Sequence, residues 1–242
     1  MRRVRQVALR FVGIGAAKCA TTWTYRMLGR HSQVQFPAGK EVNFWSKPAP
    51  RDMARYAEVM SEHDPSVAAG EISVSYVHLS VATMRELQAH APDVRLFMNV
   101  RHPVDRAWSR AKMRVRDQGA VLADLTDAQL MEYVFGGNNV AAGDYAASLT
   151  RWASVFPAEQ MLITRFDDVV ARPAWVIERL LGHIGVEPDE QLSTIAQRTR
   201  RPSTPDRPLP DGIREMLARL YAEPMRRFRD EYGIDYTGPG RS

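Results

Sequence analysis

Residues 11–23 of this chain read FVGIGAAKCATTW, and this stretch decides the fold. It begins as an apolar run typical of a buried strand, breaks at two glycines and restarts as a helix. Glycine lets the backbone turn sharply and approach a ligand closely. Thr21 or Thr22 is expected to cap the helix, whose amino end attracts anions, and Lys18 adds a point charge. The stretch therefore predicts a loop that cradles a phosphate group.

The composition is that of an ordinary globular protein. The chain has 242 residues, of which 45% are hydrophobic and 25% charged, and this length fits one large domain over residues 1–242. The formal net charge of +5 favours anionic ligands. The arginines are spread along the whole chain, which argues against a nucleic-acid partner. Only four of the 33 basic residues are lysine, so a lysine in the loop is unusual.

Cysteine and histidine usage argues against disulfides and metal sites. The single cysteine, Cys19, excludes an internal disulfide and cannot build a metal site alone. The six histidines include no i, i+4 pair. The basic start of the chain imitates a signal peptide, but its apolar stretch is interrupted at Arg10. No segment approaches the roughly 18 uninterrupted apolar residues of a membrane helix. We therefore predict a cytoplasmic protein without stable membrane insertion.

The remaining pattern alternates strands with helices. Apolar runs predict strands at 94–100 and 160–164, with a weaker candidate at 67–72. Helices are predicted at 21–30, 80–90, 103–116, 145–154, 173–182 and 211–231. This alternation predicts an α/β fold with a central parallel sheet. Residues 117–143 change character and contain one helix start, so we interpret them as a surface excursion, a candidate lid or acceptor-side segment.

A glycine-rich loop with a lysine also raises the possibility of a Walker A nucleotide site. No glycine precedes Lys18 directly, and the next residues, Cys19 and Ala20, offer no hydroxyl for a magnesium ion. The strand at 94–100 is followed by Arg101 instead of a metal-binding aspartate. These departures indicate a phosphate site that works without magnesium.

Two separated motifs resemble those of the sulfotransferases that use 3′-phosphoadenosine 5′-phosphosulfate (PAPS). The first family signature is a strand followed by Lys-x-x-Thr-Thr/Ser, matched at residues 18–22. The second is a strand ending in Arg-x-Pro with a serine eight residues after the arginine, matched by Arg101, Pro103 and Ser109. Either motif alone is weak, but the two together are specific.

Three further segments are similar to the heparan-type branch and to many bacterial members. Residues 37–44 (PAGKEVNF) contain its Glu-x-x-Phe segment, and residues 70–76 (GEISVSY) and 143–152 (GDYAASLTRW) follow in similar order. The resemblance spans about residues 8–230. It implies a P-loop-like three-layer fold, with helices on both faces of the sheet.

The resemblance also implies an activity and a set of site residues. A sulfuryl group would pass from PAPS to a hydroxyl, leaving 3′,5′-adenosine bisphosphate (PAP), with no metal involved. Lys18 would stabilise the leaving phosphate, Arg101 and Ser109 would bind the 3′-phosphate, and Glu41 would accept the hydroxyl proton. The implied donor-binding residues are Gly15, Ala16, Ala17, Lys18, Cys19, Ala20, Thr21, Thr22, Trp23, Arg101, Ser109, Arg198, Arg200, Arg201 and Ser203.

Some questions stay open at the level of sequence. Heparan-type members often carry a catalytic lysine where this chain has Ile72, and Lys40 is the candidate replacement. His78 is an alternative base. The acceptor is a hydroxyl of a small molecule, a carbohydrate or a lipid-linked compound, and the oligomeric state is undetermined. A nucleoside-triphosphate kinase and a non-catalytic nucleotide-binding scaffold are the competing functions.

Overall fold

The computed structural model describes residues 7–62, 64, 66–198 and 207–237. The chain divides into two compact units, which are described separately. The sheet unit comprises Met1–Asn99 and Arg151–Arg201, and the helical unit comprises Val100–Thr150 and Pro202–Ser242.

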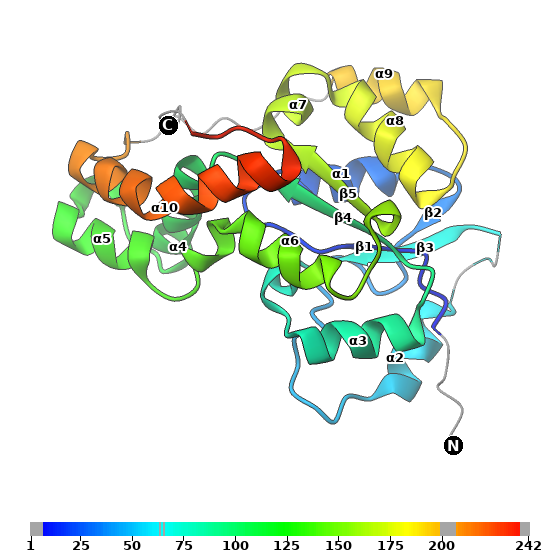
Figure 1. Ribbon diagram of the computed structural model, residues 1–242. Helices are drawn as coiled ribbons and strands as arrows, with labels where there is room; N and C mark the ends of the chain where they lie inside the picture. Colours follow the sequence, from blue (N-terminus) through cyan, green and yellow to red (C-terminus); the bar gives the residue numbers. More distant parts are fainter. Residues whose placement is uncertain (1–6, 63, 65, 199–206, 238–242) are drawn as a thin grey trace. The chain divides into compact units, whose positions relative to one another are not determined.

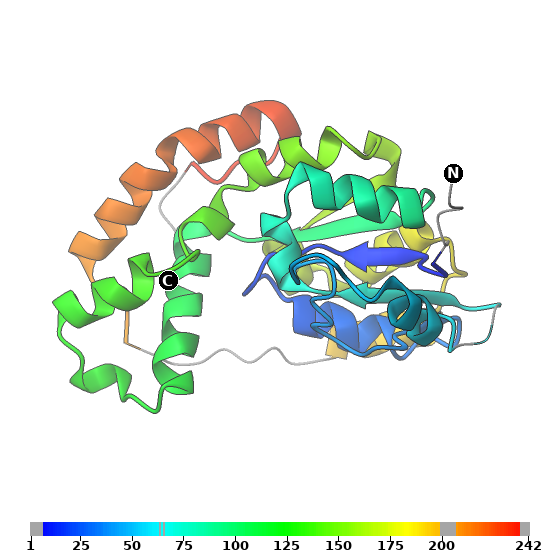
Figure 2. The same ribbon diagram turned by 90° about the horizontal axis from the view of Figure 1, so that it is seen from below.

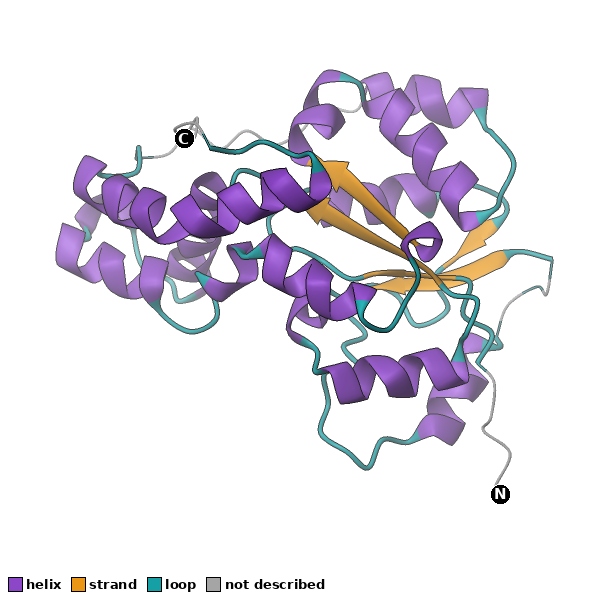
Figure 3. Ribbon diagram, in the orientation of Figure 1, coloured by secondary structure: helices purple, strands orange, loops and turns teal. Residues whose placement is uncertain are grey.

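The sheet unit is built on five strands in the order β2-β3-β1-β4-β5, labelled in Figure 1 and drawn in orange in Figure 3. They are β1 (Phe11–Gly13), β2 (Val34–Gln35), β3 (Ala68–Ile72), β4 (Arg95–Val100) and β5 (Met161–Arg165). In the centre, Val12 of β1 lies opposite Glu71 of β3 on one side and Leu96 of β4 on the other, both in parallel pairing. Parallel strands share a direction, so the segments that follow β1 and β3 leave the sheet at one edge, where α/β folds bind their ligands.

Helices cover both faces of this sheet. The sheet unit contains α1 (Thr21–Leu28), α2 (Met53–Met60), the 3-10 helices η1 (Val74–His78) and η4 (Ala158–Gln160), α3 (Val81–His90), α7 (Phe166–Ala171), α8 (Pro173–Ile184) and α9 (Glu190–Arg198). Helices α1, α8 and α9 lie on one face and α2 and α3 on the other (Figure 1), and the latter pair is nearest the viewer in Figure 2. The predicted α/β fold with three layers is confirmed.

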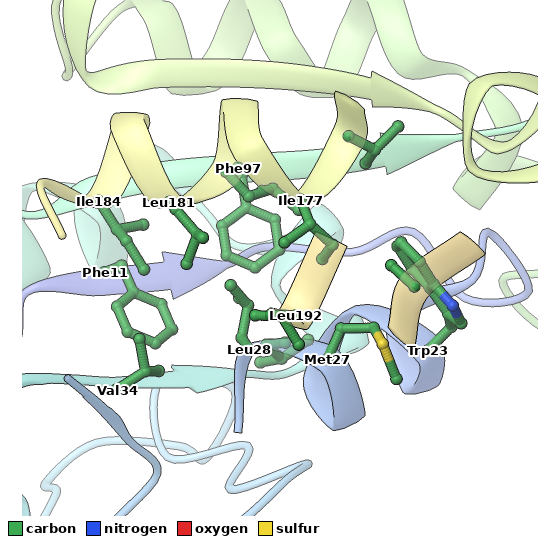
Figure 4. Packing of buried hydrophobic residues seen from close by; sticks show 14 of the residues in the cluster. Phe11, Trp23, Met27, Leu28, Val34, Phe97, Ile177, Leu181, Ile184 and Leu192 are labelled. Carbon is green, nitrogen blue, oxygen red and sulfur yellow. The ribbon is translucent and has the colours of Figure 1, made fainter. Parts of the chain in front are cut away.

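The core of the sheet unit forms where α1, α8 and α9 meet the strands (Figure 4). Phe11 of β1 is fully buried there, with its ring edge-on to Phe36 at a centroid distance of 5.4 Å. Gly70 of β3 is paired with Phe11, and a Cβ at Gly70 would lie 2.4 Å from the Phe11 ring. The absence of a side chain at Gly70 therefore lets the ring fill the space over β3.

The helical unit contains a buried hydrogen-bond network around Arg106. Its elements are α4 (Pro103–Asp117), η2 (Leu122–Asp124), α5 (Asp127–Phe135), η3 (Ala141–Gly143), the start of α6 (Tyr145–Ala153) and α10 (Asp211–Tyr232). The fully buried guanidinium of Arg106 donates to the Asn139 side-chain oxygen at 3.0 Å. Asn139 in turn donates to the carbonyls of Ala107 and Val134. A buried charge requires such hydrogen bonds. Because the partners lie in both helices, the network joins α4 to α5.

The four predicted strands and six predicted helices are confirmed with small shifts at their ends. The helix start predicted inside 117–143 is also confirmed, since Thr126 and Gln129 form a capping box at the start of α5. Sequence patterns missed β2, α2, α7 and α9, which are short elements of two to nine residues. Their formation depends on packing more than on a local periodic signal.

Gly70→Ala is expected to lower the free energy of unfolding by about 1–3 kcal/mol, because the added methyl group overlaps the Phe11 ring. Urea denaturation measures the change. Gly182→Ala is the matched control, because Gly182 lies within α8 and a Cβ there meets nothing within 4 Å. The control is expected to be neutral or stabilising by up to about 1 kcal/mol, and equal losses in both variants would contradict the packing argument.

Candidate active site

The loop between β1 and α1 forms a concave turn of the backbone. Gly15 has a φ of 126°, and Lys18 and Ala20 both have a φ of 69°. Left-handed residues in such a turn direct successive N–H groups toward one point, which is the geometry of an anion-binding nest. A Cβ at Gly15 would lie 2.6 Å from the Val77 side chain, so both the φ and the close contact require glycine. We call residues 14–20 the cradle loop.

The amino end of α1 differs from the sequence prediction in its cap. Ala20 is the N-cap residue and no side chain caps the helix, so the predicted cap by Thr21 or Thr22 is wrong. The left-handed conformation of Ala20 turns the chain one residue early and places both threonines inside the first turn. Thr21 is buried and Thr22 is exposed. First-turn N–H groups have no partner within a helix, so this end is suited to an anion.

The cradle loop is fixed from behind by β4. The buried Asn99 side chain donates to Thr24 Oγ1 at 2.9 Å, and that hydroxyl donates to the carbonyl of Ala20 at 3.3 Å. The backbone of Asn99 is bonded to Gly15 at 2.7 Å and to Ala16 at 2.9 Å. The strand therefore holds both ends of the loop.

Two residues of the first motif have packing roles. Gly13, expected to help the turn, ends β1 and packs against Phe97 and Ile72, where a Cβ would lie 2.7 Å from the Phe97 ring. Cys19 is fully buried and its thiol lies 3.7 Å from the carbonyl of Ala17. Both residues are therefore part of the packing around the loop.

Glu41 lies on a loop that β3 and η1 hold by hydrogen bonds. Its backbone N–H donates to the Ile72 carbonyl at 2.9 Å, and its carboxylate accepts the Val74 N–H at 3.0 Å. The other carboxylate oxygen is paired with the ammonium of Lys40. About a third of the Glu41 side chain (34%) is exposed, so the carboxylate is held and still accessible.

Val74 links Glu41 to the cradle loop. Its N–H binds the Glu41 carboxylate, and its carbonyl oxygen would lie 3.2 Å from a Cβ at Gly15. Glu41 and the cradle loop, which come from different parts of the sequence, are therefore neighbours through one residue. The structure therefore places the Glu41 carboxylate beside the loop that carries Lys18.

Behind this edge lies a fully buried carboxylate that sequence reasoning did not assign to the site, Glu71 of β3. It accepts hydrogen bonds from Tyr56 at 2.6 Å, Tyr76 at 3.0 Å and Ser73 at 3.1 Å. Burial raises the pKa of Glu71 to about 7, although the three hydroxyl donors favour its charged form. The sequence feature that indicates a role for Glu71 is the presence of a charged residue within the apolar strand predicted at 67–72.

The second motif lies in the helical unit. Arg101 follows β4, and the Tyr145 hydroxyl accepts its N–H at 3.3 Å and donates to its carbonyl at 2.8 Å. Ser109 is half-buried in α4, which begins at Pro103 as predicted. Tyr145 therefore fixes the backbone of Arg101 from both sides, a role that the sequence pattern did not indicate.

The other residues named from the sequence lie at the end of α9, around Glu41 and η1, or outside the described residues. Arg198 is exposed at the end of α9, whereas Arg200, Arg201 and Ser203 lie outside the described residues. Ile72, at the position of the lysine in heparan-type members, is fully buried, and Lys40 is the cation that contacts Glu41. His78 is exposed at the end of η1.

The described residues contain neither a cluster suited to a metal ion nor a helix suited to cross a membrane. Residues 7–62, 64, 66–198 and 207–237 contain no group of three or more His, Cys, Asp or Glu side chains placed to hold a metal ion. Within the same residues, every helix is too short or too polar to cross a membrane.

The raised pKa of Glu71 predicts a pH-dependent stability. A carboxyl group whose pKa rises from 4.5 to about 7 on folding binds its proton more tightly in the folded protein. The free energy of unfolding of wild type minus that of Glu71→Gln should therefore be highest below pH 4.5. It should fall by about 3 kcal/mol between pH 4.5 and 7 and stay constant above. Urea denaturation from pH 4.5 to 8.5 measures this difference, and a pH-independent difference would contradict it.

Comparison with known proteins agrees with this geometry. Residues 11–209 match the family model described as the sulfotransferase domain. A crystal structure of a sulfotransferase from Alicyclobacillus acidocaldarius aligns with a TM-score of 0.73 and 25% sequence identity, covering 94% of this chain and 96% of that chain. No curated protein sequence matches significantly.

More distant structures share the fold. A mouse sulfotransferase complexed with PAP aligns with a TM-score of 0.58 and 14% identity, covering 94% of this chain and 90% of that chain. A sulfotransferase from Mycobacterium avium aligns with a TM-score of 0.58 and 13% identity, covering 97% and 79%. The family match begins at the first residue of β1 and takes in the cradle loop, Glu41 and the Arg101 motif, and this chain therefore belongs to the sulfotransferase family.

Proposed function

We propose that this sulfotransferase acts on a hydroxyl of a small-molecule, carbohydrate or lipid-linked acceptor, with Lys18 and Glu41 as its catalytic residues. When bound, PAPS supplies the sulfuryl group and departs as PAP. The observation that carries the proposal is the contact of Val74 with both the cradle loop and Glu41. It brings a carboxylate next to the loop that we propose binds the anionic end of the donor.

The cradle loop fits the 5′-phosphosulfate in three ways. The left-handed residues provide inward N–H groups, the uncapped end of α1 provides a positive dipole, and Lys18 provides a full charge. We assign residues 15–23 to this end of the donor. Lys18 stabilises the negative charge that develops on the leaving oxygen, an interaction that strengthens in the transition state.

Arg101 and Ser109 are proposed to bind the 3′-phosphate of the donor. Arginine suits this role because its planar guanidinium can donate two parallel hydrogen bonds to phosphate oxygens. The two hydrogen bonds from Tyr145 restrict the backbone of Arg101 and so reduce the ordering cost of binding. Arg198, Arg200, Arg201 and Ser203 stay candidates for the same end of the nucleotide.

Glu41 is proposed as the base that accepts the proton of the acceptor hydroxyl. Sulfuryl transfer, like phosphoryl transfer, can pass through a loose transition state in which the nucleophile loses its proton late. Placement of the base then matters more than its strength. The Val74 N–H and the Lys40 ammonium fix the orientation of the Glu41 carboxylate, and Lys40 adds positive charge beside the reacting groups.

Calorimetry with PAP tests the donor site. Wild type is expected to bind PAP, whereas Lys18→Ala and Arg101→Ala each weaken binding by about 10- to 100-fold, because each removes a charged hydrogen bond. The double variant should give no measurable heat. Lys47→Ala, which removes an exposed lysine outside the cradle loop, is the control and should bind like wild type.

Titration with ATP and magnesium in the same calorimetric assay distinguishes the proposed PAP site from the nucleotide site of a kinase. Binding of ATP with magnesium in place of PAP, or unchanged PAP binding by the double variant, would overturn the assignment of the donor site.

Transfer of label from radioactive PAPS to a metabolite extract of the source cells tests the base. Glu41→Gln is expected to reduce the transfer rate by about 100-fold or more, because amide nitrogen and oxygen cannot accept the proton. The affinity for PAP should stay within about twofold of wild type. Unchanged activity in Glu41→Gln would remove the base from the mechanism, and absence of label transfer by wild type would favour the scaffold alternative.

A further inference from the structure

We propose that Glu71 is a positioning residue for Glu41, acting through the hydroxyls of Ser73 and Tyr76. This inference rests on the proposed role of Glu41 as the base. The buried carboxylate of Glu71, in β3, holds in place the loop that carries the Glu41 carboxylate.

Two relays connect Glu71 to the loop that carries Glu41. Ser73 Oγ donates to the Glu71 carboxylate at 3.1 Å and accepts the Asn43 N–H at 3.0 Å. The Tyr76 hydroxyl donates to the same carboxylate at 3.0 Å and accepts the Trp45 N–H at 3.3 Å. A hydroxyl has one proton, and an ionised carboxylate only accepts. Glu71 therefore sets the direction of both hydroxyls and leaves their lone pairs facing the backbone amides.

The loop needs this support because its backbone is unfavourable. Glu41 and Asn43 have φ values of 59° and 53°, in the left-handed region that residues with a Cβ rarely occupy. Such conformations persist only where the surroundings fix them. The Asn43 side chain donates to the Glu41 carbonyl at 2.7 Å, so an Asn43 held by Ser73 also holds the residue that carries the base.

The charge of Glu71 is therefore part of the support. The groups that face it are Tyr56 from α2, Tyr76 from η1, Ser73 after β3 and, as a nearby charge, Glu41, which is itself paired with Lys40. Protonation of Glu71 converts one acceptor into a donor, and one of the three hydroxyls must then turn. The relays weaken as the pH falls through the pKa of Glu71, about 7, and are fully formed above it.

Hydrogen exchange at individual amides tests the relays without any acceptor. In the full-length protein, Ser73→Ala should accelerate exchange at Asn43, and Tyr76→Phe should accelerate it at Trp45. Each effect should be about tenfold, the loss of one hydrogen bond. Glu71→Gln should accelerate both amides.

Tyr56→Phe is the matched control. It also removes a hydroxyl from Glu71, but that hydroxyl does not accept the Asn43 or Trp45 N–H, which bind Ser73 and Tyr76. Phenylalanine also keeps the ring that stacks on Phe44 of the loop. At alkaline pH, exchange at Asn43 and Trp45 in Tyr56→Phe should equal that of wild type. Equal acceleration in Tyr56→Phe and Tyr76→Phe would mean that loss of any hydroxyl loosens the protein, and it would overturn the proposal.

The pH dependence of sulfuryl transfer supplies the second readout. Wild type should show a step in kcat near pH 7 that Glu71→Gln lacks, with Glu71→Gln about tenfold slower above pH 8. The KM for PAPS should be unchanged, because the cradle loop is intact. Tyr56→Phe should move the step to higher pH and reach the wild-type plateau, because the Tyr56 hydrogen bond favours the charged form of Glu71.

The two possible failures are distinguishable. If Glu41→Gln transfers sulfuryl groups as fast as wild type, the proposed role of Glu41 as the base fails, while the exchange data still report whether Glu71 holds the loop. If Glu41→Gln is inactive but Glu71→Gln keeps the wild-type rate, pH step and amide exchange, the positioning role of Glu71 is overturned.

Discussion

The close approach of Gly15 to the start of η1 is the constraint on which the site depends. The cradle loop reaches Val74 and Val77 only because Gly15 has no side chain and adopts a positive φ. Val74 is then available on its other side to Glu41. The proposed donor-binding loop after β1 and the proposed base on the loop before α2 are thus joined through Val74.

Buried polar groups stabilise the same edge of the sheet, although burying them costs desolvation free energy. Glu71 is fully buried, and its raised pKa shows that the surroundings disfavour its charge. Three hydroxyls offset part of that cost. Asn99 has a comparable place behind the cradle loop, where it binds Thr24. Buried polar groups of this kind define one arrangement of the loops, whereas apolar contacts alone would tolerate several.

The sequence predicted the parts of the molecule that depend on local chemistry. The run at 11–23 indicated strand, loop and helix because its apolar residues, glycines and lysine are adjacent in the chain. The two family motifs and Glu41 were found for the same reason. The alternation of apolar runs with helical patterns was enough to predict the parallel sheet, whose pairing the structure confirms.

What the sequence did not predict depends on contacts between distant segments. The cap of α1 differs because Ala20 adopts a left-handed conformation that β4 fixes through Asn99 and Thr24. Gly13 was assigned to a turn, but the rings and side chains packed on it come from other strands. The burial of Glu71 and the clamp of Tyr145 on Arg101 are likewise visible only once the chain is folded.

The pairing of Glu41 with its own neighbour Lys40 has a consequence for protein engineering. Here both occupy one short segment, and the groups that orient it lie within residues 71–76. Grafting these two peptides onto a related scaffold would transfer the proposed base together with the groups that orient it, and the remaining surface could be diversified for new alcohols.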